Sequence, residues 1–239
     1  MRQLGGFEIL TLMNRKRILV FGDSNSWGFV PCSADEATTR YDSSTRWPAV
    51  MAARLGSGVE LIEEALSGRT TDLDDHQIDL PSAHLRGATF NGAKLLPAIV
   101  ASHLPLDLVI IMLGTNDLKA RFKRSPQNIA LAALGLARLI AECDGGVATI
   151  YPSPKVLLVA PPPLGTGFHH PDEWAGGPEK SLELGSVLRD AAAVAQLPFL
   201  NAGEFIKTDG KDGIHFTAEA QVKLGEAVAK KVSHLLEKA

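Results

Sequence analysis

The sequence predicts an α/β fold in which helices cover both faces of a sheet of parallel strands. Five short apolar runs alternate with longer stretches of helical periodicity, at residues 17–21, 59–62, 106–113, 155–160 and 198–200. The runs are continuously apolar rather than alternating with polar residues, which is typical of parallel strands buried on both faces. This βαβ alternation predicts a three-layer α/β/α sandwich with right-handed crossovers.

Helical patterns separate these runs, at residues 46–55, 92–103, 126–142, 178–196 and 217–238. The pattern over 126–142 is the clearest, because its apolar residues recur at helical spacing behind Ser125, a preferred N-cap, and Pro126, at the first helical position. Its other face carries Leu131 and Leu134, so this helix is expected to pack against a partner as well as the sheet. Thr217 is expected to begin the last helix.

Length and composition limit the classes of protein to which the chain can belong. A chain of 239 residues with 45% hydrophobic residues fits one globular α/β domain, which we place at residues 15–239. The short apolar stretch near the N-terminus precedes the basic cluster at 15–17, which is the reverse of a signal peptide. We expect residues 1–14 to be a disordered leader, because Met13 lies just before the first predicted strand. Two long loops, 69–91 and 161–177, are typical of lids, binding loops or interface arms.

Charge and cysteine content limit the binding partners and the cellular compartment that we expect for the protein. The net charge of -3 argues against nucleic-acid binding, which needs a basic excess to neutralise phosphates. No apolar run is long enough to span a bilayer, so no membrane partner is expected. The two cysteines, Cys32 and Cys143, show no metal-type spacing and suit a reducing cytoplasm. Cys32 has no paired histidine in its block and is expected to be inert.

Small polar residues and glycines follow four of the five predicted strands, at residues 22–28, 67–71, 114–117 and 209–216. In open α/β sheets, ligands bind at the edge where the carboxyl ends of the strands meet. The convergence of these four segments is more informative than any one of them. It predicts a ligand-binding or catalytic site at that edge.

A hydrolytic site would give each of these segments a task. Ser24 follows a strand and opens a helix, so it is the candidate nucleophile, with His215 as its base. Asp212, three residues earlier, can orient the imidazole and stabilise its charged form. The oxyanion donors would be the backbone N–H groups of Ser24 and Gly68 and the side-chain amide of Asn116. Such a site needs no cofactor and no metal.

Each residue also has a structural interpretation. Ser24 alone could be only a helix N-cap, and Asp212 and His215 could be turn and surface residues. Trp27 and Phe29 could lie in the core or could line an acyl pocket, and the sequence does not separate these alternatives. Asp23 and Asp117 are expected to be structural. The acidic and histidine-bearing stretch 72–84 matches no metal template and is expected to be solvated surface.

The four segments together resemble the SGNH (GDSL-type) hydrolases. They contain Gly-Asp-Ser at 22–24, Gly68, Gly-Thr-Asn-Asp at 114–117 and Asp-Gly-Ile-His at 212–215, in that order. The resemblance implies a flavodoxin-like, five-stranded parallel sheet of order 2-1-3-4-5. It also implies that Ser24 is the nucleophile, that Asp212 and His215 are the acid and base, and that Gly68 and Asn116 bind the oxyanion.

Longer stretches resemble the arylesterase/acyltransferase branch, which includes a mycobacterial acyltransferase/perhydrolase. These are the GDSxxWG run at 22–28, EEALSGRTT at 63–71, LPLDLVIIMLGTNDLKARF at 104–122 and DGIHFT at 212–217. That branch implies acyl transfer to alcohols or peroxide and a homo-octamer with narrow, apolar access. Asn25 and Ser26 stand where the family often has Leu and Thr.

We therefore expect a serine esterase that hydrolyses short-chain acyl or aryl esters through an acyl-enzyme, with water or an alcohol as acceptor. A carbohydrate acetyl-esterase, or a lysophospholipase or thioesterase, would use the same residues. A non-catalytic protein that binds acyl ligands is the alternative from another class. A fourth alternative is a chain that acts mainly as an oligomeric scaffold.

Overall fold

The computed structural model describes residues 15–237, apart from residues 35, 79, 144 and 209. The expected leader, residues 1–14, lies outside the described residues. In chain order the strands and helices are β1 (Lys16–Gly22), α2 (Ser24–Trp27), α3 (Trp47–Leu55), β2 (Val59–Ala65), α4 (Gly92–His103), β3 (Leu108–Met112), α5 (Pro126–Ala141), β4 (Lys155–Ala160), α6 (Gly177–Val194), β5 (Phe199–Asn201) and α7 (Ala218–Glu237).

The five strands form one sheet of order β2-β1-β3-β4-β5, in which every pair is parallel. This confirms the predicted fold class and strand order. Three strands differ from the prediction in length, and β1 is longer by one residue at each end. Strand β2 continues to Ala65 because its ladder with β1 runs to the pair of Gly22 and Ala65. Strand β3 begins at Leu108 because its ladder with β1 starts there, opposite Ile18.

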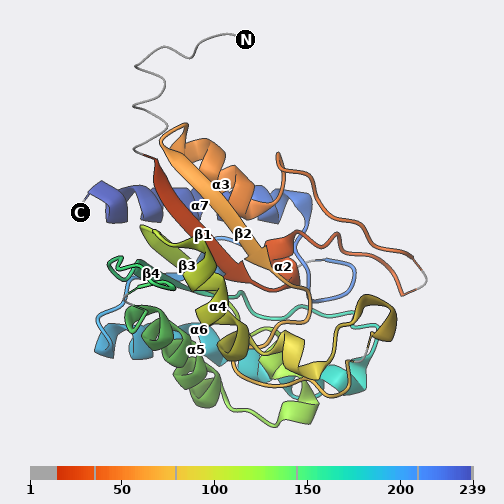
Figure 1. The fold of residues 1–239 in the computed structure, drawn as a ribbon. Coiled ribbons are helices and arrows are strands. Elements are labelled where there is room, and N and C mark those ends of the chain that lie inside the picture. The colour runs from red at the N-terminus through yellow and green to blue at the C-terminus, as the bar shows by residue number, and fades with distance from the viewer. Residues whose placement is uncertain (1–14, 35, 79, 144, 209, 238–239) are drawn as a thin grey trace.

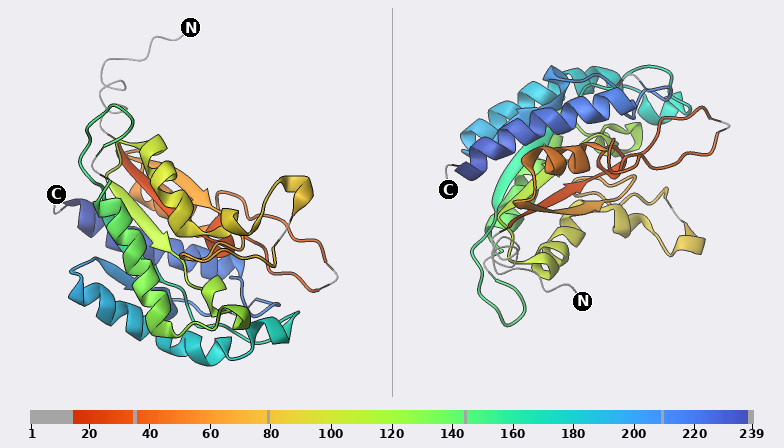
Figure 2. Two further views of the ribbon diagram at one scale, coloured as in Figure 1. Left: turned by 60° about the horizontal axis from the view of Figure 1, so that its bottom comes forward. Right: turned by 90° about the horizontal axis from the view of Figure 1, so that it is seen from above.

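Helices α3 and α7 cover one face of the sheet, and α4, α5 and α6 cover the other (Figure 1). Successive strand residues point to opposite faces, so Val20 packs in the core under α3 and α7 while Phe21 packs in the core under α4 and α5. Two buried faces explain why the inner strands are apolar without alternation. Helix α7 runs alongside α3 (Figure 2).

The helix signals in the sequence agree with the structure at two termini. The Ser125 hydroxyl accepts a hydrogen bond from the backbone N–H of Asn128 at 3.2 Å, as an N-cap does. The Thr217 hydroxyl accepts from the N–H of Ala220 at 3.2 Å, and α7 begins one residue after Thr217. On α5, Leu134 packs against the core, whereas Leu131 is 65% exposed. Assembly through this face stays a prediction.

Within the ranges that the structure describes, no helix combines the length and the apolar character needed to cross a membrane. A cytoplasmic location stays a prediction.

Candidate active site

The turn after β1 places Ser24 at the first position of α2. Gly22 is needed there because a Cβ atom would lie 2.2 Å from the Ser26 Oγ atom. The Asp23 carboxylate caps α2 by accepting a hydrogen bond from the backbone N–H of Asn25 at 3.0 Å. The first N–H groups of a helix have no partner within it, so the N–H of Ser24 is left for a ligand.

Three of the predicted residues form a hydrogen-bonded chain. The His215 Nε2 atom lies 2.9 Å from the Ser24 Oγ atom, and the His215 Nδ1 atom lies 2.7 Å from the Asp212 Oδ2 atom. The other Asp212 oxygen accepts from the backbone N–H groups of Ile214 and His215, both at 2.9 Å. The carboxylate thus holds its own turn and the imidazole ring at once. This arrangement can move a proton between Ser24 and His215.

Hydrogen bonds from α2 and α7 keep the turn at 212–215 beside Ser24, which lies 191 residues away from His215 in the chain. The Asn25 side-chain amide donates to the Ile214 carbonyl at 3.3 Å. The fully buried Gln221 of α7 donates to the Asn25 carbonyl at 3.0 Å and accepts from the Trp47 N–H at 2.9 Å. Asn25 is therefore part of this link.

The carboxyl groups of Asp212 and Asp23 differ in their pKa values. Burial raises the pKa of Asp212, but hydrogen bonds and charge from His215 outweigh it and lower this pKa to about 2. Burial raises the pKa of Asp23 to about 7, and the charge of Asp117 adds to the rise. Asp212 is therefore ionised near neutral pH, as a group that orients an imidazole must be. Asp23 acts as a cap, in agreement with its predicted structural role.

The two remaining predicted donors lie in loops that are tied to each other. Gly68 has φ +86°, a left-handed conformation that glycine adopts readily. The Asn116 side-chain amide donates one hydrogen bond to the Arg69 carbonyl at 3.1 Å and has a second N–H for a ligand. Asp117 accepts from the backbone N–H of Thr71 at 3.0 Å. These bonds join the loop after β2 to the loop after β3.

These loops enclose a cavity of about 250 Å³, which we call the Ser24 cavity. Phe29 lines it and stacks on the His215 ring, with a centroid distance of 3.9 Å. Trp27 is not among the lining residues; its half-buried ring lies under the Arg40 guanidinium, 5.3 Å from the centroid. The structure thus separates the two aromatic residues that the sequence left undecided. Cys32, expected to be inert, also lines the Ser24 cavity.

A cluster of paired charges lies beside the part of the Ser24 cavity that Lys119 and Glu173 line. The Arg121 guanidinium binds the fully buried Asp75 through two hydrogen bonds, at 3.0 and 2.6 Å, and binds Glu173 at 2.7 Å. Lys119, which lines the cavity, lies 3.3 Å from the same Glu173 oxygen. Burial lowers the pKa of Lys119, and the charge of Glu173 opposes that change. The cluster therefore fixes the loop at 171–174 against the loops after β2 and β3.

Comparison with known proteins assigns the family. A model of the GDSL-like lipase/acylhydrolase family matches residues 20–222, which include all four strand-end segments. The chain belongs to this family. GDSL-like enzymes of this kind are the SGNH esterases and acylhydrolases, so the chain is a hydrolase of that family. No curated protein sequence matches it.

Several solved structures are similar to this GDSL-like hydrolase. Est24, a carbohydrate acetylesterase from Sinorhizobium meliloti, is 48% identical with a TM-score of 0.85, over 92% of this chain and 100% of that one. The M. smegmatis aryl esterase is also 48% identical with a TM-score of 0.85, over 92% and 99%. A second carbohydrate acetylesterase family member from S. meliloti is 32% identical with a TM-score of 0.81, over 93% and 99%.

Sequence reasoning missed part of the site of this GDSL-like hydrolase. The loop at 161–177 was expected only to be a lid, a binding loop or an interface arm, and its His169, His170 and Trp174 line the Ser24 cavity. Sequence reasoning also missed Lys119 and Glu173 in the same lining. Position was the only signal for Lys119, which lies three residues after Asn116. Nothing in the sequence pairs Glu173 with Lys119, because the pairing depends on how two loops meet.

The described carboxylates in the acidic stretch at 72–84 form ion pairs with basic side chains of the protein. Asp72 pairs with Arg124 at 2.7 Å, Asp74 with Lys94 at 2.6 Å, and Asp75 with Arg121. In the described residues, no three His, Cys, Asp or Glu side chains gather in a group that could hold a metal ion. The described carboxylates Asp72, Asp74 and Asp75 therefore serve the structure of the loop. Asp75 is fully buried, so the expectation that this stretch is solvated surface is wrong for that residue.

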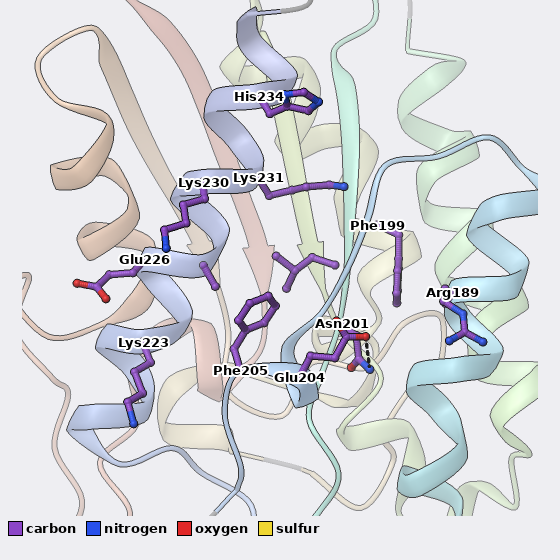
Figure 3. A pocket seen from close by; sticks show the side chains of 12 residues that line it. Arg189, Phe199, Asn201, Glu204, Phe205, Lys223, Glu226, Lys230, Lys231 and His234 are labelled. Carbon is purple, nitrogen blue, oxygen red and sulfur yellow. Dashed lines mark hydrogen bonds between the residues drawn. The ribbon is translucent and has the colours of Figure 1, made fainter.

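A larger cavity lies elsewhere in the hydrolase, between α6, β5 and α7 (Figure 3). This cavity, which we call the β5 groove, has a volume of about 680 Å³. Phe199 and Phe205 line it, and so do Lys230, Lys231 and His234 of α7. None of the three hydrogen-bonded residues Ser24, Asp212 and His215 lines it. Its size therefore does not make it the candidate active site.

Proposed function

We propose that this GDSL-like hydrolase cleaves short-chain acyl or aryl esters through an acyl-enzyme formed on Ser24. The observation that supports this most strongly is the chain from Asp212 through His215 to Ser24, which opens onto the Ser24 cavity. Ser24 lies at a helix start beside a base that an ionised carboxylate orients, as nucleophilic catalysis requires.

The first half-reaction acylates Ser24. Its oxygen attacks the ester carbonyl carbon while His215 Nε2 takes the hydroxyl proton. The negative charge on the carbonyl oxygen is stabilised by the backbone N–H groups of Ser24 and Gly68 and by the free N–H of Asn116. The intermediate collapses as His215 gives the proton to the leaving alcohol, and the acyl group remains on Ser24.

The second half-reaction removes the acyl group. Water attacks the acyl carbonyl, gives a proton to His215, and the proton then returns to Ser24 as the acid leaves. An alcohol or peroxide that occupies the place of this water would receive the acyl group instead. The small volume of the Ser24 cavity, about 250 Å³, supports short acyl groups as substrates.

A carbohydrate acetylesterase function is the second candidate. The specific observation in its favour is the similarity to Est24, which equals the similarity to the M. smegmatis aryl esterase in identity and TM-score. Both candidates use the same chemistry and differ in the leaving alcohol. A lysophospholipase or a thioesterase would need a longer acyl or pantetheine channel, and the Ser24 cavity is small for either.

Turnover of 4-nitrophenyl acetate by the wild type and by Ser24→Ala, with and without 1-propanol, tests the proposal. We expect turnover by the wild type only, and propyl acetate as a further product when the alcohol is present. Turnover without propyl acetate would retain the esterase and exclude acyl transfer. Ser24→Ala activity equal to the wild type would refute the proposed nucleophile.

A second measurement covers a wild type that is inactive on this ester. Intact-mass measurement after treatment with a fluorophosphonate would then show whether Ser24 is a reactive nucleophile. An adduct on the wild type that is absent from Ser24→Ala would retain an acyl hydrolase with a different substrate. No adduct would point to a protein that binds acyl ligands without cleaving them.

A further inference from the structure

Two side-chain hydrogen bonds hold the His215 ring and leave one motion open to it. Its Nδ1 atom lies 2.7 Å from the Asp212 Oδ2 atom, and its Nε2 atom lies 2.9 Å from the Ser24 Oγ atom. A hydrogen bond to an imidazole nitrogen lies close to the plane of the ring, so these bonds resist a shift within that plane more than a tilt out of it. When Ser24 carries an acyl group its oxygen has no proton to share, and Asp212 alone then holds the ring.

Phe29 covers one face of the His215 ring. The two ring centroids are 3.9 Å apart and the ring planes meet at 19°, which is a stacked arrangement. Carbon atoms of packed groups are in contact at about 3.5–4.0 Å, so the faces of the two rings touch. Any tilt of the imidazole moves one of its edges toward Phe29. The stack therefore opposes the motion that the hydrogen bonds leave open.

The Phe29 ring also attracts the protonated form of His215. The face of an aromatic ring carries partial negative charge, and a cation within about 6 Å of the ring centroid is drawn to it. Only 11% of the His215 side chain is exposed, so water screens this attraction weakly. His215 is neutral before it takes the Ser24 proton and positively charged afterwards. The attraction is thus stronger in the transition state than in the resting enzyme, and only such differences raise kcat.

The backbone around Phe29 is fixed by the segments on both sides of it. Its N–H donates to the Ser24 carbonyl at 3.0 Å, next to Gly28, which ends α2 with φ 91°. An antiparallel bridge between Phe29 and Arg40 joins this segment to the chain that returns along it. Helix α2, which begins with Ser24, therefore also sets the place of the Phe29 ring. One short segment carries both the nucleophile and the surface against which its base rests.

We propose that Phe29 is a positioning residue that keeps the His215 ring aligned with Ser24 and favours its protonated form during turnover. This inference rests on the proposed esterase function and adds to it a residue that acts through the base. A wall of the acyl pocket is the other role open to Phe29, and it leads to a different expectation. A pocket wall changes the preference among acyl groups, whereas support for His215 changes the rate by the same factor for every acyl group.

Turnover of two esters by Phe29→Leu tests the inference. Leucine keeps an apolar side chain but removes the flat aromatic face. The esters are 4-nitrophenyl acetate and 4-nitrophenyl butanoate, which differ only in the acyl group. We expect kcat to fall by about two- to tenfold on both, the range for one aromatic contact, while KM stays within about twofold of the wild type. A change in KM alone, or a loss on only one ester, would assign Phe29 to the acyl pocket and overturn the inference.

Two further variants separate the aromatic face from the shape of the turn. Phe29→Tyr keeps the ring and should retain kcat within about twofold, so equal losses in the Tyr and Leu variants would overturn the role of the stack. Trp27→Leu is the matched control, because the Trp27 ring lies under Arg40 and is not among the residues that line the cavity. Its kcat should also stay within about twofold. A loss in Trp27→Leu equal to that in Phe29→Leu would show that the turn, and not the stack, sets the rate.

Failure of this inference can be told apart from failure of the proposed function. If the wild type turns over both esters and Phe29→Leu equals it, the inference is wrong and the esterase stands. If the wild type cleaves neither ester but forms a fluorophosphonate adduct on Ser24, the rate of that reaction replaces kcat, because His215 must accept the same proton. Phe29→Leu should then react about two- to tenfold more slowly. Without an adduct on the wild type, both the proposed function and the inference are refuted.

Discussion

The Ser24 cavity and the β5 groove differ in a way that shows which feature identifies a candidate active site in this fold. The β5 groove is the larger, at about 680 Å³ against about 250 Å³, and it has aromatic and basic side chains. Only the Ser24 cavity contains a hydroxyl in hydrogen-bond contact with an imidazole that a carboxylate orients. Convergence of complementary groups, rather than volume, therefore identifies the candidate active site.

The reason for the difference lies in the topology. The Ser24 cavity lies where the loops after several parallel strands meet, so side chains distant in sequence converge on one point. The β5 groove lies beside the short edge strand β5, and several of its charges pair with neighbours. Glu226 binds Arg54, Lys223 binds Glu219, and Arg189 binds Asp190. Such exposed pairs contribute little and aim no group at a common point.

Among the substitutions that compare the two cavities, Asp212→Asn in the Ser24 cavity should cause the largest loss of activity. The amide cannot stabilise a charged imidazole and favours the wrong tautomer, so kcat on 4-nitrophenyl acetate should fall by about 10³- to 10⁴-fold. The matched change in the β5 groove, Glu226→Gln, should leave kcat within about twofold. Comparable losses in the two variants would break the distinction between the cavities.

Asn116→Ala should have the next largest effect. Removing one donor to the oxyanion is expected to lower kcat by on the order of 10²- to 10³-fold, with a smaller change in KM. The substitution also removes the hydrogen bond to the Arg69 carbonyl, so the melting temperature is measured alongside. An unchanged kcat would show that Asn116 does not bind the oxyanion.

Asp23→Asn tests the buried carboxyl group beside Ser24 through stability rather than activity. The pKa of Asp23 is raised from 3.8 to about 7, so the folded state keeps a proton that the unfolded state releases. This difference in pKa adds on the order of 4 kcal/mol to the free energy of unfolding. The contribution is fully present below pH 3.8 and is lost as the pH rises through 7. Asn cannot ionise and still accepts from the Asn25 N–H, so this loss is absent in the variant.

Melting temperatures of the wild type and Asp23→Asn at pH 4 to 8 measure the difference. The variant should gain on the wild type by several degrees as pH rises. Asp117, with a pKa raised to about 6, titrates in both proteins, and its charge acts on an ionisable Asp23 only in the wild type. The lowered pKa of Asp212, about 2, acts only in more acidic solution. A constant gap across this range would contradict a raised pKa for Asp23.

Substitution of the basic residues of the β5 groove should have the smallest effect. Lys230→Ala combined with Lys231→Ala removes two cations from α7 without touching the Ser24 cavity. Esterase activity on 4-nitrophenyl acetate should stay within about twofold. A large loss of kcat in this double variant would show that the β5 groove takes part in turnover.

Local signals in the sequence were sufficient for the fold and for part of the site. The apolar runs predicted all five strands, and Ser125 correctly predicted the cap of α5, because both depend on neighbouring residues. Asp212 and His215 lie three residues apart, so one turn can bring their side chains together. The boundaries of β2 and β3 were wrong by two or three residues, because pairing with β1 sets them.

The remaining features depend on contacts between distant segments. Phe29 lies on the His215 ring while Trp27, two residues earlier, lies under Arg40, and no local pattern distinguishes the two aromatic residues. The pairing of Lys119 with Glu173 arises where two loops meet. The sequence by itself determined the order of the elements and the residue types at the strand ends, because periodicity and capping are local properties. Only the tertiary structure decided which side chains share the cavity, because that depends on how long loops pack over the edge of the sheet.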